Sequence, residues 1–485
     1  MRSTLLYNEG FVHAAGKYPD LTSNNSASLR YIGPITRTRL ERASLDVSGR
    51  LTTLKTKLDN FDFPAIFSGI MTSKTSDERK EVNFPEWRNA FMMMRKFTLN
   101  YYKHRFGDWP PKASSKKNEL ETSGLNRLVV KELYQDFATL YDLLVNRRNI
   151  TTRTLGAAVN DSGDQSEAEL RALRRVLDEY DRSTPPIQPP VPFDVPLLPT
   201  LATTREGYGS DAKKDTKARS KKLKGEEIAR ILRGSYNIDA DIQTPFLDAF
   251  KNAEHRAAHG CNITDIVDLR VGQWIFLYAV LQSLPMLAVD APQARYSRGV
   301  EYFLCVPPRS NAPWMRVDER GNQRSWYGVG GSGSSTALVS FPTDVVEFSV
   351  EGVYKRSHCW IMAQKWAAQA GLVPPTQIFP NSPSTSSPTF YRGQDHLAPP
   401  THVSRVPVGG APMNDQPRPV SARSSSPISQ SHRNSSIFGP EQISVPSHNS
   451  SGSLPPPPRQ TLEVDPKKTF DAIIGDMENQ KKKKK

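Results

Sequence analysis

Residues 81–112 read EVNFPEWRNAFMMMRKFTLNYYKHRFGDWPPK, and this stretch carries the strongest helical pattern of the chain. Asn83 is suited to cap a helix, Glu86 follows three residues later, and Gly107 is suited to close the C-terminus. The apolar side chains between these signals form one broad helical face: Trp87, Ala90, Phe91, Met94, Phe97 and Tyr101. Further apolar side chains lie off that face, so we expect the helix to be covered on more than one side: Met92, Met93, Leu99 and Phe106.

Helical spacing recurs along much of the remaining chain. The segments predicted as helices are 36–61, 124–146, 166–180, 226–233, 244–259, 264–284 and 350–370. The segment 264–284 is apolar nearly all round, which predicts a buried central helix for its half of the chain. Short strands are expected at 287–289 and 302–306. The sequence therefore predicts a mainly α fold, a multi-helix domain with a few short strands and a long disordered C-terminal tail.

Changes in composition suggest the domain organisation. The expected parts are a weakly structured N-terminus (1–33), a helical region (34–182), a Pro-rich and then basic linker (183–225), a second helical region packing with the first (226–306), a partly ordered segment (307–370) and a disordered Ser/Pro-rich tail with a Lys-rich end (371–485). The hydrophobic fraction of 37% and the 39 prolines agree with a chain that is only partly able to form a core.

The formal net charge of +14 favours anionic partners, although simple solubility explains it equally well. Cys261, Cys305 and Cys359 are far apart and odd in number, which is typical of a reducing compartment and not of a disulfide framework. The N-terminus lacks the apolar stretch of a signal peptide, and the longest apolar run, 274–289, is too short and too interrupted to span a bilayer. We therefore expect a soluble intracellular protein, cytoplasmic or nuclear, with no transmembrane segment.

The stretch at 81–112, followed by SGLNRLVVKELYQDFATLYDLLV at 123–145, resembles a family of filamentous-fungal proteins known only as a domain of unknown function. The resemblance is clearest over 81–150 and extends to about residue 305. It implies no catalytic residues. Members of that family have more folded chain before this region, so the resemblance implies a shortened or alternative N-terminus here.

The sequence offers little catalytic chemistry. GVGGSG, at 328–333, matches a dinucleotide-binding pattern, but neither a buried strand before it nor a helix after it is expected, which favours a flexible linker. His255 and His259 are four apart on a predicted helix, and Cys261 follows, as zinc ligation would require. Their sequence, HRAAH, lacks the glutamate of HExxH, so a solvated polar face is preferred, and no metal or cofactor is predicted. His358 and Cys359 are a second pair of candidate ligands.

Basic and serine-rich segments are the best short signals. KKDTKARSKKLK has the composition of a nuclear-localisation patch, formed by Lys213, Lys214, Lys217, Arg219, Lys221, Lys222 and Lys224. Because it follows a proline-rich segment, we expect an import receptor to reach it. The terminal lysines 481–485 favour weak contact with acidic membranes. Candidate phosphorylation sites in the tail are Ser382, Ser387, Ser426 and Ser436, and PPPPR at 455–459 is a candidate polyproline ligand.

These features favour a non-catalytic intracellular scaffold or regulatory protein that binds protein partners through its helices and carries a phosphorylatable tail. The alternative hypothesis is a nuclear or nucleic-acid-associated factor acting through the basic segments. A zinc-dependent enzyme built on the histidines is the least favoured class.

Overall fold

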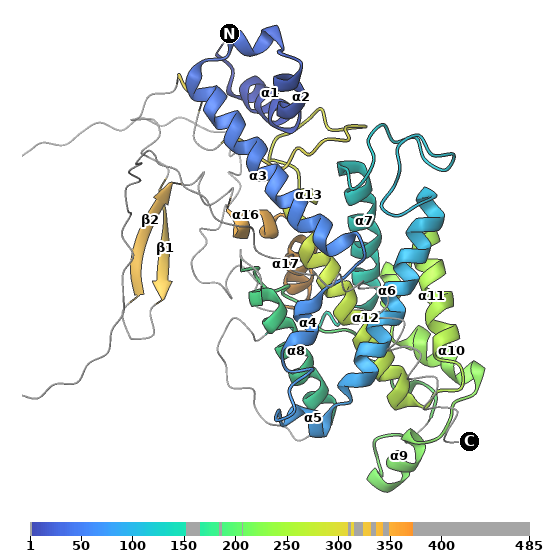
Figure 1. Cartoon of the computed structure of the whole chain (residues 1–485). Coiled ribbons are helices and arrows are strands. Elements are labelled where there is room, and N and C mark those ends of the chain that lie inside the picture. Colours follow the sequence, from blue (N-terminus) through green and yellow to red (C-terminus); the bar gives the residue numbers. More distant parts are fainter. Residues whose placement is uncertain are drawn as a thin grey trace, which may run out of the picture. The chain divides into compact units, whose positions relative to one another are not determined.

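The protein is described here by a computed structural model covering residues 2–151, 165–183, 187–205, 207–308, 312–314, 324–330, 336–342 and 349–371 (Figure 1). Its helices are α1 (Thr4–Gly16), α2 (Tyr18–Ser23), η1 (Ala27–Tyr31), α3 (Pro34–Leu58), α4 (Pro64–Ser68), α5 (Glu78–Glu81), α6 (Phe84–Phe106), α7 (Arg127–Leu144), α8 (Gln165–Ser183), η2 (Leu201–Thr203), α9 (Ala212–Arg219), α10 (Gly225–Gly234), η3 (Ile238–Ala240), α11 (Pro245–Ala257), α12 (Ile263–Ser283), α13 (Pro285–Ala288), α16 (Val350–Lys355) and α17 (His358–Ala370). The two strands, β1 (Arg324–Gly330) and β2 (Thr336–Pro342), pair antiparallel, from Arg324 opposite Pro342 to Gly330 opposite Thr336. The predicted mainly α fold is confirmed.

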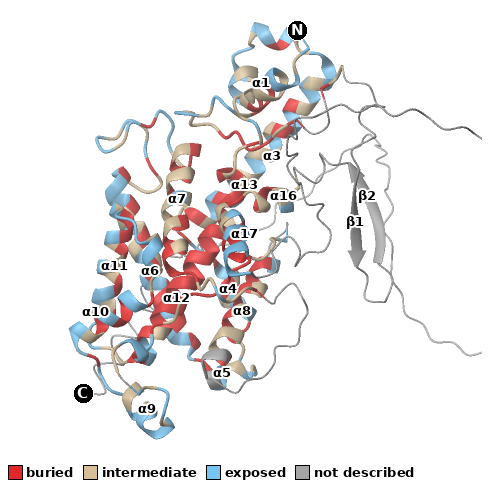
Figure 2. Cartoon of the chain, turned by 180° about the vertical axis from the view of Figure 1, so that it is seen from behind, coloured by how far each residue is buried: buried red, intermediate tan, exposed pale blue. Residues whose placement is uncertain are grey.

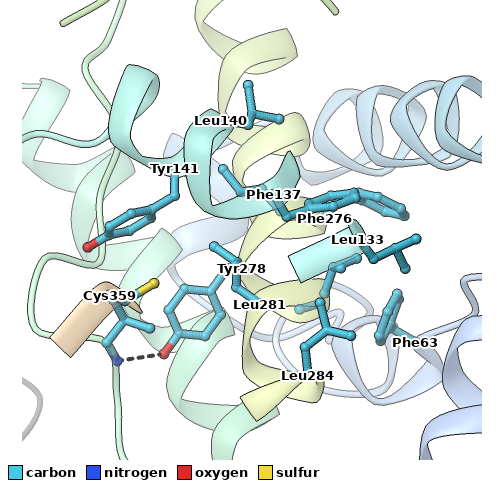
Figure 3. Packing of buried hydrophobic residues seen from close by; sticks show 14 of the residues in the cluster. Phe63, Leu133, Phe137, Leu140, Tyr141, Phe276, Tyr278, Leu281, Leu284 and Cys359 are labelled. Atoms are coloured by element: carbon cyan, nitrogen blue, oxygen red, sulfur yellow. Dashed lines mark hydrogen bonds between the residues drawn. The ribbon is translucent and has the colours of Figure 1, made fainter. Parts of the chain in front are cut away.

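α12 is the centre of the core (Figure 2). Every residue from Asp268 to Gln282 is buried, as the all-round apolar pattern predicted. The Phe276 ring lies 5.2 Å from that of Phe91 on α6 and 6.1 Å from that of Phe137 on α7, measured between ring centroids. Figure 3 shows Phe276 and Phe137 packed together among the aliphatic side chains of both helices.

The contact between α6 and α12 depends on a glycine. A Cβ atom placed on Gly272 would lie 2.3 Å from the carbonyl oxygen of Trp87 and 2.5 Å from the Cβ of Ala90. Only a residue without a side chain allows the two backbones to approach so closely. The predicted apolar face of α6 is therefore directed at α12. Met92 and Met93 are 39% and 50% exposed, so the expected covering of a further side of α6 is wrong at these two residues.

The proline-rich segment that the sequence predicts as a linker instead contributes to the core. Val191, Phe193 and Val195 are buried. Their backbone is paired: Asn146 N donates to Val195 O over 2.9 Å, Tyr141 Oη donates to Phe193 O over 2.9 Å, and Trp274 Nε1 donates to Asp194 O over 2.8 Å. Proline lacks an N–H, so this segment has few donors that need partners inside the protein. The two predicted helical regions consequently share one core.

The N-terminal segment differs from the expected weak structure, because it forms α1, α2 and η1. Phe11, Val12 and Ala15 of α1 are buried, and Val12 packs with Leu304 and Ala291 while Phe11 and Ala15 join the main core. α1 shows no amphipathic period, because the adjacent residues Phe11 and Val12 are both buried while Leu5 and Leu6 are exposed, so its sequence carries no helical pattern.

The expected short strands at 287–289 and 302–306 do not form. Residues 285–288 are the helical turn α13, and 302–306 are irregular, while the two described strands lie at 324–342. The helix expected at 350–370 is present as α16 and α17, and the Trp366 ring stacks on Tyr141 at 6.0 Å between centroids. Residues 372–485, including the predicted disordered tail, lie outside the described residues. None of the described helices is long and apolar enough to cross a bilayer.

Candidate interaction surface

The basic segment 213–224 begins as a short helix. Asp211 caps α9, since its Oδ1 accepts hydrogen bonds from Lys213 N at 3.0 Å and Lys214 N at 3.4 Å. The segment that the sequence predicts as part of a linker is thus helical up to Arg219 and continues as an irregular stretch to Lys224.

The lysines of this segment face solvent. The exposed residues, called here the lysine surface, are Lys213, Lys214, Lys217, Lys221, Lys222 and Lys224. Arg219 differs from them because it is half-buried and its Nε donates to Tyr208 Oη over 2.8 Å. Arg219 therefore helps to hold α9 in place, and it does not belong to the predicted patch as an exposed cation.

Leu223 fixes the C-terminal end of the lysine surface. Its side chain is 6% exposed and packs in a cluster with Ile228, Ile231 and Leu269. Its backbone N–H donates to Cys261 O over 3.0 Å. The segment KKLK is consequently attached to the body at its third residue, while its three lysines are exposed.

Three carboxylates near this surface, those of Asp211, Asp215 and Glu227, are bonded within the protein. Asp215 Oδ2 accepts a hydrogen bond from Gly209 N at 3.0 Å. Glu227 accepts one from Lys224 N, which is the main reason that its pKa is lowered, and it lies 3.7 Å from Arg205 Nη2. Lys214 has an exposed ion pair with Asp211 at 3.5 Å. None of the other lysines of the surface has an ion pair with a described carboxylate.

The candidate zinc ligands are not arranged for metal binding. His255 and His259 are both exposed, and α11 ends at Ala257, so His259 lies beyond the helix and does not share its face. Cys261 is half-buried, and burial together with Asp265 raises the pKa of its thiol, against the opposing effect of Lys222. Among the described residues no group of three His, Cys, Asp or Glu side chains is placed to hold a metal ion.

His358 and Cys359 have structural contacts. His358 Nε2 lies 2.9 Å from both carboxylate oxygens of Asp142, which connects α17 to α7. Cys359 is buried in the core, and burial raises the pKa of its thiol well above the usual range (Figure 3). A buried thiol of raised pKa is a poor nucleophile at neutral pH.

The glycine-rich stretch at 328–333 does not have the strand–helix context of a dinucleotide-binding site. Gly328 and Gly330 belong to β1, and the next described element is the strand β2, whereas a dinucleotide fingerprint requires a helix there. Ser382, Ser387, Ser426, Ser436, the polyproline stretch and the terminal lysines lie outside the described residues.

Sequence reasoning missed a buried ionic centre between α11 and α12. Arg270 Nε donates to Glu254 Oε1 over 2.8 Å, and Tyr236 Oη donates to Glu254 Oε2 over 2.6 Å. Arg270 Nη1 also donates to the carbonyl oxygens of Leu197 and Ser235, each at 3.0 Å. An arginine inside the apolar stretch 264–284 was the available signal, because a buried charge requires a partner.

A family model described as "Domain of unknown function (DUF8004)" matches residues 1–63, which comprise α1, α2, η1, α3 and the turn after α3. This similarity supports the expected resemblance to an uncharacterised domain, and it falls N-terminal to the stretch on which that resemblance was based. No curated protein and no solved structure matches the chain. A fungal source stays a prediction.

Proposed function

We propose that this protein is a non-catalytic scaffold or regulatory protein whose lysine surface binds an acidic segment of a protein partner. The observation that carries the proposal is the fixed display of lysines on α9 and on the stretch anchored by Leu223. The nearby carboxylates offset only part of this charge, because residues 211–227 hold seven lysines and arginines against four aspartates and glutamates. A cationic surface of this kind attracts acidic partners and accelerates their association.

Affinity purification from cells with charge-reversed variants tests this proposal. The test variant carries Lys213→Glu, Lys217→Glu and Lys221→Glu. The control variant carries Lys55→Glu, Lys96→Glu and Lys103→Glu, which are exposed residues of α3 and α6 and give the same change of net charge. We expect specific partners to be lost from the test variant and kept by the control. Equal recovery with both variants would contradict the proposal.

Regulation through the tail is the second part of the proposal. It rests on the Ser-Pro pairs at Ser382, Ser387 and Ser426 and on Arg433, three residues before Ser436. Each phosphate would add between one and two negative charges to a basic chain. Mass spectrometry of the protein purified from its native cells should detect phosphate on these serines, and replacing all four by Ala should change the recovery of partners.

The alternative is nuclear import or nucleic-acid binding through the same lysines. Burial of Leu223 favours a fixed surface over an address that a receptor must pull out, since extraction would expose Leu223 and break its hydrogen bond to Cys261. A fluorescent fusion carrying Lys221→Ala, Lys222→Ala and Lys224→Ala tests import, and a move from nucleus to cytoplasm would favour the alternative. Binding of DNA or RNA that weakens steeply with salt would favour the nucleic-acid version.

A further inference from the structure

The first helices of the chain leave large apolar side chains uncovered. Leu5 and Leu6 of α1 are 50% and 62% exposed, Tyr31 at the end of η1 is 91% exposed, and Ile35 in the first turn of α3 is 59% exposed. These four residues, called here the apolar tip, belong to the part of the chain that matches the uncharacterised family. Scattered apolar residues on a surface are ordinary, so the significance of the tip depends on whether its members lie together.

The tip is held together by a contact between α1 and α3. Tyr7 Oη lies 3.5 Å from Thr36 Oγ1, so the first turns of the two helices are neighbours. Leu6 directly precedes Tyr7, and Ile35 directly precedes Thr36. Figure 1 shows α1 and α2 beside the beginning of α3, near the N-terminus. The exposed apolar residues of both helices therefore lie on segments that meet at one end of the α1–α3 unit.

The surroundings of the tip are cationic. Residues 1–8 and 21–40 contain no aspartate or glutamate. Arg2, Arg30 and Arg37 are exposed within these stretches. The first acidic residue after the tip is Glu41, almost two helical turns beyond Ile35. The nearest carboxylates between these stretches are Glu9, which accepts hydrogen bonds from the backbone N–H groups of Arg295 and Tyr296, and Asp20, which has an ion pair with Lys17. The exposed apolar and aromatic group is thus accompanied mainly by arginines.

Exposed apolar side chains beside arginines favour an anionic bilayer surface over a second copy of the chain as the binding partner. In a symmetric dimer built on the tip, the arginines of one copy would face those of the other, which is unfavourable. At an anionic bilayer surface the same arginines would meet lipid phosphates, with which guanidinium groups form paired hydrogen bonds. Tyrosine is favoured at the membrane–water interface, and leucine and isoleucine gain by leaving water for the acyl-chain boundary.

We propose that the apolar tip is a membrane-contact site, at which Leu5, Leu6, Tyr31 and Ile35 enter the interface of an anionic phospholipid bilayer while Arg2, Arg30 and Arg37 contact the headgroups. The proposal is independent of the partner assigned to the lysine surface, because it uses other residues and a different physical effect. It concerns contact with one leaflet and requires no spanning helix.

The test must separate apolar insertion from simple charge attraction, since the lysine surface and the terminal lysines also attract anionic vesicles. The full chain is sedimented with phosphatidylcholine vesicles containing about a third phosphatidylserine, and with phosphatidylcholine alone. The variant Tyr31→Ser/Ile35→Ser keeps the net charge, as does Leu5→Ser/Leu6→Ser. The control is Met92→Ser/Met93→Ser, which removes exposed apolar side chains from α6.

We expect the wild-type chain to bind the anionic vesicles, each tip variant to bind about tenfold or more weakly, and the control to bind within about twofold of the wild type. A Tyr31→Trp variant should shift its fluorescence to the blue on binding. Because all substituted side chains are exposed, the variants should keep the wild-type circular dichroism spectrum. No binding by the wild type, or equal binding by the tip variants and the control, would overturn the proposal. A wild-type dimer in sedimentation velocity that becomes monomeric in Tyr31→Ser/Ile35→Ser would assign the tip to a second copy.

Discussion

Arg270 donates a hydrogen bond from Nε to Glu254 Oε1 over 2.8 Å, and the two side chains are 0% and 1% exposed. Removing both charges from water costs free energy, which the attraction between them offsets only when their remaining donors and acceptors are paired. Tyr236 and the carbonyls of Leu197 and Ser235 pair most of these groups, while Arg270 Nη2 is buried without a hydrogen-bond partner. The ion pair thereby joins α11 and α12 to the end of the proline-rich segment and to the end of α10.

Glu254→Ala should destabilise the protein strongly, because it leaves the Arg270 guanidinium buried without its counter-ion. We expect a loss of about 3–5 kcal/mol in the free energy of unfolding, measured by urea denaturation. Glu226→Ala, on the exposed side of α10, should change it by less than about 0.5 kcal/mol. Similar small effects of both substitutions would show that the ion pair is not buried.

Gly272→Ala and Gly49→Ala should change stability in opposite directions. The added methyl group at Gly272 collides with the backbone of α6, which should cost about 1–3 kcal/mol or more. Gly49 lies within α3 and a Cβ atom there meets nothing within 4 Å, so alanine should add up to about 1 kcal/mol. A Gly272→Ala protein as stable as the wild type would contradict the close approach of α6 and α12.

Asp268 should make the protein less stable as the pH rises. Burial raises its pKa to about 6 from 3.8, although the hydrogen bond from Trp87 Nε1 at 2.8 Å lowers it. Between pH 3.8 and about 6 the folded state therefore binds more protons than the unfolded state. The stability that protonated Asp268 contributes is fully present below its unfolded-state pKa and is lost as the pH rises through its folded-state pKa. Asp268→Asn should stabilise the protein by about 1–3 kcal/mol near pH 8 and by little near pH 4, in urea titrations at both pH values.

An equal effect of Asp268→Asn at both pH values would show that the carboxylate is not the cause. Asp136 offers an independent check of the same direction, since burial raises its pKa to about 6 against the hydrogen bond from Tyr102 Oη at 3.0 Å. Asp136→Asn should therefore flatten the dependence of stability on pH in the same range.

Amphipathic patterns in the sequence predicted helices that bury one face, and α6, α7, α8 and α11 are of this kind. α12 was predicted for the opposite reason, since it is apolar all round. The proline-rich segment and α1 were misread, because composition and period report on local preference and not on which neighbours cover a segment. The lysine surface was found from its composition. Its anchor at Leu223 and the exposure of the apolar tip depend on contacts between distant residues, and no local pattern records them.

Phe91→Ala and Leu133→Ala should each cost about 2–5 kcal/mol in the free energy of unfolding, because both side chains are at most 1% exposed. Lys96→Ala, on the exposed side of α6, should cost less than about 0.5 kcal/mol. Urea denaturation of the three variants checks the assignment of helix faces. Equal small losses at all three positions would mean that the faces are assigned wrongly.

α16 and α17 are the last described helices of the chain. Tyr354, Trp360 and Trp366 of α16 and α17 are buried. The sequence predicted a helical region that ends at residue 306 and only partial order over 307–370, but the burial of these side chains predicts a protease-resistant fragment that extends to about Gly371. A chain ending at Gly371 should keep the unfolding free energy of the full chain, whereas a chain ending at residue 348 should lose roughly 3 kcal/mol or more, the cost of removing even one buried tryptophan. Mass spectrometry of the fragments left by limited proteolysis gives a second measurement. A stable product ending near residue 305, as stable as the full chain, would show that α16 and α17 do not belong to the core.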